Sequence, residues 1–352
     1  MLNPFFRLST KDKMFFARHM AIMTRSGMQI LDILRILQRQ TQSKTFKTII
    51  DTLIVSVKNG QFLSDGLEKH HAIFGDFFIN IIKVGEISGT LAENLEYLAQ
   101  SLAKNQELQS KIKGAMIYPI ILLIVTLGMA GGLTYFIFPK ILPIFTSLHV
   151  KLPLITRIFI AVSSFMLAHG VALLFGIIAF AIGIVLLLRI PPIHYAWHRV
   201  TISLPVAGTM VKNYNMVNFA RSMSLLLKSG VKIVQAVEIT GRSTTNLVYK
   251  KVLEKISQEV GHGDMISKYL MLYPRLFPPV FSEMVAVGEQ TGKLDDTGIY
   301  LADFYENELD DSTKSLSSIL EPLLLLFMGT IVGFIAISII YPIYQISQNI
   351  NN

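Results

Sequence analysis

The chain has 352 residues, of which 51% are hydrophobic and 16% are charged, and its formal net charge is +8. This composition excludes an ordinary soluble protein, because the apolar residues are gathered in blocks typical of membrane spans. The absence of Cys excludes disulfides, cysteine metal sites and thiol chemistry.

The basic residues are scattered along the chain, and several of them, such as Lys104, Lys111 and Arg189, lie beside the apolar blocks. This placement favours flanks held against anionic lipid over a nucleic-acid surface, so we expect no nucleic acid as a partner. The segment from Met1 to Lys13 lacks an apolar core of signal-peptide length, and no cleaved signal is expected.

Residues 14–116 are predicted to form a first bundle of about six helices. Ile30, Ile33, Leu34 and Leu37 recur at i, i+3, i+4 and i+7, which is the pattern of one buried helix face. A glycine follows the third predicted helix, and Ser64, like Ser267 later in the chain, stands where the N-cap of a short fourth helix is expected. No stretch shows sustained strand alternation, so the fold class is all-α.

The segment from Gly85 to Gly89 is predicted to be a turn between the fifth helix and a long sixth one. Glycine at both ends permits positive φ, and Ser88 is expected to cap the next helix. Glu86 within this turn has two interpretations of equal weight, an exposed contact for a partner protein or local hydrogen bonding at a helix end.

Residues 117–138 are predicted to be the first transmembrane helix. Tyr118-Pro119 opens this apolar run and Pro139 closes it. At about 1.5 Å per residue the run covers about 33 Å, enough for a bilayer core. An external loop, 139–157, a second span, 158–188, a second bundle, 189–318, and a third span, 319–346, follow.

The second bundle and third span repeat the first at a constant offset of 203 positions. Phe16-Ala17-Arg18 recurs as Phe219-Ala220-Arg221, and Val84-Gly85-Glu86 recurs as Val287-Gly288-Glu289. Such internal duplication fixes the architecture. The residues equivalent to those of the first turn and span are Gly288, Glu289, Gly292, Glu321, Pro322 and Pro342.

The distribution of Lys and Arg predicts that both bundles are cytoplasmic and the C-terminus is outside. The loop 139–157 contains few basic residues, and the tail after Tyr341 contains none.

Candidate chemistry is sparse. Gly288 to Lys293 resembles a phosphate loop but has three residues between its glycines where four are required. His194 and His198 share helical spacing, but no third metal ligand is evident. We therefore expect no catalytic, cofactor or metal residues. His169 and Glu321 are ionisable groups in apolar surroundings, which leaves a small transporter or channel as the alternative function.

The residues around the first span resemble those of the type II secretion system F-protein family, which includes the inner-membrane platform proteins of type IV pilus assembly. Lys111-Ile112, Tyr118-Pro119 and Ile137-Phe138-Pro139 fill the family's signature in register, and the doubled Gly-Glu-x-Ser/Thr-Gly segments also match. The resemblance covers the chain from about Phe16 to Pro342. Many relatives carry a further helical segment before the first repeat, and in them this segment helps to contact the assembly ATPase. The resemblance therefore implies that the ATPase contact is reduced or made differently here.

The resemblance implies a non-enzymatic platform that oligomerises in the inner membrane, binds a hexameric assembly ATPase and moves pilin or pseudopilin subunits. Other inner-membrane assembly proteins are expected as partners. The residues expected to matter set the turns, shape entry to the spans or contact partners, and they are Gly85, Glu86, Gly89, Tyr118, Pro119, Pro139, Gly288, Glu289, Gly292, Glu321, Pro322 and Pro342.

Overall fold

The structure is a computed structural model that describes residues 8–137, 139–140, 143, 154–205 and 207–350. Across these ranges it is helical and contains no strand, as expected. The chain divides into two compact units. One comprises residues 1–111 and 198–312, and the other comprises residues 112–197 and 313–352.

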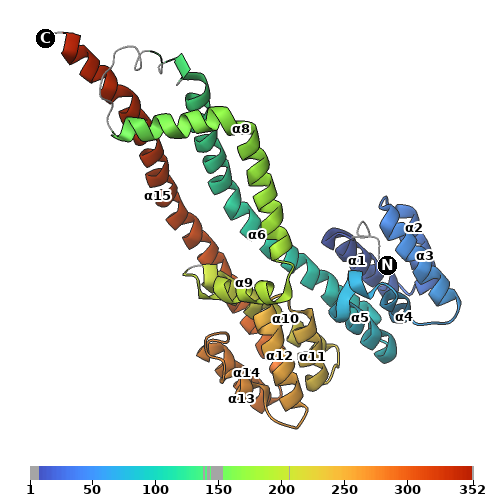
Figure 1. Ribbon diagram of the computed structural model, residues 1–352. Coiled ribbons are helices and arrows are strands. Elements are labelled where there is room, and N and C mark those ends of the chain that lie inside the picture. The colour runs from blue at the N-terminus through green and yellow to red at the C-terminus, as the bar shows by residue number, and fades with distance from the viewer. Residues whose placement is uncertain (1–7, 138, 141–142, 144–153, 206, 351–352) are drawn as a thin grey trace. The chain divides into compact units, whose positions relative to one another are not determined.

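The first unit contains both repeats, and within the described ranges each repeat contributes six helices (Figure 1). In the first repeat the shorter helices α1 to α5 precede the long helix α6. Their bounds are α1 Thr10–Arg25, α2 Ile30–Gln40, α3 Lys44–Lys58, α4 Leu63–Glu68, α5 His71–Ser88 and α6 Leu91–Gly132. The expected number of helices is therefore confirmed, although the sixth is long.

The second repeat has the same helix order. Its helices are α10 Ala207–Lys228, α11 Ile233–Ser243, α12 Leu247–Val260, α13 Ile266–Leu270, α14 Pro279–Thr291 and α15 Leu294–Ile350. Helix α9, Pro191–Ser203, precedes them.

Each bundle is centred on four aromatic side chains at equivalent positions. In the first repeat Phe16 lies 6.0 Å from Phe46 and 6.3 Å from both Phe74 and Phe78 between ring centroids. Such ring pairs add about 0.5–1.5 kcal/mol each to the hydrophobic gain of burial. The aromatic cores explain why each repeat packs as a bundle.

The equivalent four in the second repeat are Phe219, Tyr249, Phe277 and Phe281, with centroid distances of 5.5 to 6.1 Å. Tyr249 replaces a phenylalanine, and its hydroxyl donates to the Leu276 carbonyl at 2.7 Å. Burial raises the pKa of Tyr249 well above its ordinary value, so the hydroxyl keeps its proton and its donor role.

The second unit is apolar, and three helices of the described chain are long and apolar enough to cross a membrane. The helical stretches that contain a candidate span are Leu91–Phe136, which begins in the first unit, then Leu154–Leu173, and then Leu294–Ser338, which also begins in the first unit. Much of their apolar surface is exposed in the isolated chain, as lipid-facing surface is. The protein is therefore a membrane protein.

Helix α8, Leu154–Leu187, leaves helical geometry at His169, where φ is −124° and ψ is 17°. The apolar stretch 158–188, expected to be one span, is thus bent within its length. Its first half packs through Phe159 against Ile335 of α15. The Thr156 hydroxyl donates to the Ser338 carbonyl at 3.3 Å, a second contact between these helices.

Candidate functional site

Glu86 caps the short helix α4 from a distance of more than twenty residues. Its carboxylate accepts hydrogen bonds from the backbone N–H of Leu63 at 2.5 Å and of Ser64 at 2.9 Å. The Ser64 hydroxyl also donates to it, at 2.6 Å. A helix N-terminus has unpaired N–H groups and a partial positive charge. The carboxylate accepts hydrogen bonds from these N–H groups, and its negative charge interacts favourably with the helix end.

Glu289 makes the same contact in the second repeat. It accepts from the N–H groups of Ile266 at 2.6 Å and Ser267 at 2.9 Å, at the start of α13. Of the two interpretations, the geometry shows helix-end hydrogen bonding. The expectation that Ser64 and Ser267 are N-caps is wrong, because α4 begins at Leu63 and α13 at Ile266, so both serines lie inside the helices and the glutamates accept from the N-terminal N–H groups.

The glycines of the predicted turns have two different roles. Gly89 and Gly292 have φ of 76° and 67°, the left-handed conformation expected of a helix C-cap. Gly85 and Gly288 are helical, so the predicted turn is shorter than expected. A Cβ on Gly85 would lie 2.9 Å from the Leu91 Cα, and the glycine therefore permits close helix packing.

Ser88 does not cap the next helix as expected. It lies in the last turn of α5, and its hydroxyl donates to the Val84 carbonyl at 2.8 Å. Because α5 continues to Ser88, only Gly89 and Thr90 separate it from α6.

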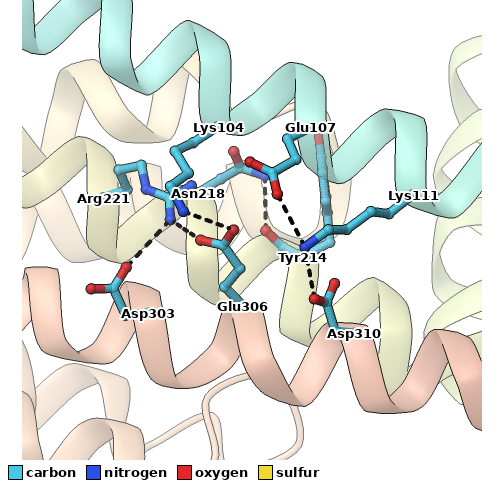
Figure 2. A network of polar contacts seen from close by, with 9 residues as sticks. All are labelled: Lys104, Glu107, Lys111, Tyr214, Asn218, Arg221, Asp303, Glu306 and Asp310. Atoms are coloured by element: carbon cyan, nitrogen blue, oxygen red, sulfur yellow. Dashed lines mark hydrogen bonds and ion pairs between the residues drawn. The ribbon is translucent and has the colours of Figure 1, made fainter.

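A charged contact joins the two repeats within the first unit, between α6, α10 and α15 (Figure 2). Arg221 of α10 lies 2.5 Å from a carboxylate oxygen of Glu306 and 3.8 Å from one of Asp303. Lys104 of α6 approaches the other Glu306 oxygen at 3.4 Å. The Arg221 and Glu306 side chains are only 11% and 8% exposed, so their attraction is little screened by solvent.

A second ion pair lies further along the same helices. The Lys111 ammonium is 2.7 Å from a carboxylate oxygen of Asp310 and 3.3 Å from one of Glu107. The hydrogen bond to Asp310 is the main cause of a raised pKa at Lys111. Glu107 and Asp310 are equivalent positions of the two repeats. One lysine therefore bridges the duplicated acids.

Sequence reasoning missed this contact. It interpreted Lys104 and Lys111 as basic flanks for anionic lipid, whereas in the structure both contact carboxylates of the second repeat. Two signals were available in the sequence. Glu107 and Asp310 are acids at equivalent positions of the two repeats, and the repeated Phe-Ala-Arg motif carries an arginine.

The predicted span-entry residues lie in the second unit. Pro119 is inside α6 and buried, and the helix continues across it, while Tyr118 is 56% exposed. Glu321 and Pro322 are exposed within α15, and α15 also continues past Pro342. Pro139 lies beyond the π-helical turn η1, Leu133–Ile137, at the end of the first apolar run, and is exposed.

The histidines give no metal centre. Within the described chain no group of three or more His, Asp or Glu side chains could hold a metal ion. His198 instead accepts a hydrogen bond at Nδ1 from the N–H of Leu247, the first residue of α12, at 3.0 Å. His169 stacks on Phe165 with ring centroids 4.9 Å apart. It borders a cavity of about 670 Å³ in the second unit, lined mainly by apolar residues.

Comparison with known proteins gives consistent matches over nearly the whole chain. The sequence pattern of the family described as "Type II secretion system (T2SS), protein F" matches twice, at residues 16–139 and 219–342. The chain is similar to the type IV pilus assembly protein PilC of Thermus thermophilus, with 37% identity over 96% of this chain and 82% of that protein. It is also similar to the type II secretion system protein F of Vibrio cholerae, with 30% identity over 97% and 84% of the two chains.

Proposed function

The chain belongs to the type II secretion system F-protein family, and from this premise we propose that it is a non-enzymatic inner-membrane platform for type IV pilus assembly or type II secretion. It binds a hexameric cytoplasmic assembly ATPase and transmits the motion of that ATPase to pilin or pseudopilin subunits. The family match in both repeats and the names of the relatives support this assignment. ATP hydrolysis belongs to the partner.

One observation carries the proposal most directly. The last helix of each bundle also contains a candidate span, because α6 and α15 include both bundle residues and apolar segments. Leu95 and Leu98 at the start of α6 are fully buried in the first bundle. A movement of the packed bundle is passed along a hydrogen-bonded helix without a flexible linker.

The proposed orientation puts both bundles in the cytoplasm and the C-terminus outside. It is supported by the scarcity of Lys and Arg in residues 139–157 and after Tyr341. In this arrangement the platform forms a homo-oligomer, and the oligomer associates with other inner-membrane assembly proteins. The prolines at positions 119, 139, 322 and 342, with Tyr118 and Glu321, set how each span enters and leaves the membrane.

The proposal is tested by photo-crosslinking in cells from two equivalent exposed positions, one in each bundle. Val55 of α3 and Gln258 of α12 are both exposed and are 203 residues apart. A photoreactive amino acid at either position should capture a cytoplasmic ATPase subunit. The proposal would be overturned if neither position captures an ATPase and if cells that lack the chain still make normal fibres or secrete normally.

A further inference from the structure

A cavity of about 480 Å³ lies within the first unit, beside the charged contact between the repeats. It is bordered by residues of α1, α6, α10 and α15, and its volume is within the range of small-molecule sites. Part of its wall is apolar, with Leu225, Ile299 and Ala302. The charged residues that line it are Arg18, Lys104, Arg221, Lys228, Glu107 and Asp303.

The two acidic residues of this cavity already have cationic partners. Glu107 contacts Lys111 at 3.3 Å, and Asp303 contacts Arg221 at 3.8 Å. By contrast, neither Arg18 nor Lys228 has an acidic partner among the residues that the structure describes. The Lys228 ammonium lies over the ring of Tyr97, 5.2 Å from its centroid. The cavity therefore has two exposed positive charges without a counter-charge from the chain.

The duplication indicates what Arg18 lacks. Arg18 is equivalent to Arg221, which is held by Asp303 and Glu306 of its own repeat. The positions equivalent to those two acids, 203 residues earlier, are Gln100 and Ala103, and both line the cavity. The first repeat has kept the arginine but has neutral residues in place of the acids.

A further donor is present in the wall of the cavity. The Nη1 of Arg221 is buried and has no hydrogen-bond partner among the described residues, although the other side of this guanidinium contacts Glu306. Guanidinium groups bind phosphate through paired N–H donors, and an adjacent ammonium adds a point charge. This set of donors is suited to an anion with several oxygen atoms.

We propose that this cavity binds a small organic phosphate of nucleotide size. The phosphate contacts Arg18 and Lys228, where the first repeat lacks acids, and the organic part lies against the wall of Leu225 and Ile299. The ligand thus takes the place that carboxylates occupy around Arg221 in the second repeat.

The test is isothermal titration calorimetry on the full-length protein in detergent micelles, with ADP and inorganic pyrophosphate as probes. We expect ADP to bind, and Arg18→Gln or Lys228→Gln to weaken its binding about tenfold or more, as expected for a lost charge-assisted hydrogen bond. Both side chains are exposed, so these variants should fold. Arg35→Gln is the matched control, because the Arg35 side chain on α2 is 43% exposed and does not line the cavity.

A further variant, Ala103→Glu, introduces a carboxylate at the position equivalent to Glu306 of the second repeat. The new carboxylate should compete for Arg18 and reduce ADP binding without lowering the thermal unfolding midpoint. Pyrophosphate should bind more weakly than ADP, since it lacks the part that contacts the apolar wall. The proposal is overturned if the wild-type chain binds neither probe, if Arg18→Gln and Lys228→Gln bind ADP as the wild type does, or if pyrophosphate binds as tightly as ADP.

Discussion

The two repeats share their architecture but differ in the acidic partners of one pair of equivalent arginines. Both have a core of four aromatic rings, and in both a glutamate from the fifth helix caps the fourth. Arg221 is buried beside Glu306, whereas its equivalent, Arg18, is exposed, and the first repeat has Gln100 and Ala103 at the positions of the two acids. The features that build the bundle are therefore duplicated, whereas the charges around the equivalent arginines distinguish one repeat from the other.

The largest expected effect comes from breaking the buried ion pair of the second repeat. Glu306→Ala leaves the Arg221 charge without its nearest partner, and loss of one member of such a pair costs about 3–5 kcal/mol. We expect a clear fall in the thermal unfolding midpoint of the full-length protein in detergent, as measured by circular dichroism.

The control for Glu306→Ala is the equivalent position of the first repeat. Ala103→Ser changes the residue equivalent to Glu306 without removing a counter-charge, and should leave the midpoint nearly unchanged. A double variant, Arg221→Met with Glu306→Leu, should recover much of the loss, because no buried charge is left unpaired. Equal losses in the single and double variants would show that the contact is not an ion pair of the kind described.

The next effect separates the two kinds of glycine within each turn. Gly85→Ala should cost about 1–3 kcal/mol, since its Cβ would press on the backbone of α6. Gly89→Ala should cost about 1–2 kcal/mol, because an L-residue there adopts positive φ.

Asparagine distinguishes the two causes, because it visits the left-handed region more readily than alanine. Gly89→Asn should therefore be tolerated better than Gly89→Ala, and Gly85→Asn should be worse than Gly85→Ala. The thermal unfolding midpoints of the four variants test this order. The reverse order at either position would contradict the assigned role of that glycine.

A smaller effect is expected from removing a glutamate cap. Glu86→Ala leaves the N–H groups of Leu63 and Ser64 unpaired at the start of α4, a loss of about 0.5–2 kcal/mol as for other N-caps. Amide hydrogen exchange should increase at these two residues. Glu68→Ala, at an exposed position of α4, is the control and should not change their exchange.

The smallest effect concerns the exposed ion pair between Lys111 and Asp310. Lys111 is 39% exposed, so Asp310→Asn should cost at most about 1 kcal/mol. The raised pKa of Lys111 means that its contribution is present at neutral pH and is lost as pH rises through that raised pKa. The difference in unfolding midpoint between the wild type and Asp310→Asn should therefore shrink as the pH is raised stepwise from neutral into the range where lysine loses its proton, and a difference that grows with pH would contradict this.

Much of the fold could be predicted because duplication and helical periodicity are local signals. Ile33, Leu34 and Leu37 are buried as their spacing indicates, and the glycines after helix ends have the expected positive φ. Periodicity reports which face of a helix is buried. It does not report which helix lies against that face.

The candidate site depends on contacts that sequence spacing does not reveal. Glu86 bonds residues 22 and 23 positions earlier, and Lys104 meets Glu306 across 202 positions. Sequence reasoning placed Ser64 as a cap because serine often has that role, whereas the structure gives the role to a carboxylate from another helix. Tertiary packing decided between two chemically reasonable caps.

We expect the two repeats to lie on the same aqueous side and to meet through α6 and α15. Because the chain has no Cys, Lys111→Cys with Asp310→Cys gives a single defined pair for a short bifunctional maleimide in cells. If both repeats are cytoplasmic, an intramolecular crosslink should still form after cells are first treated with a membrane-impermeant maleimide. Absence of the crosslink while each single cysteine reacts, or its loss after that treatment, would show that the two positions do not meet in the cytoplasm.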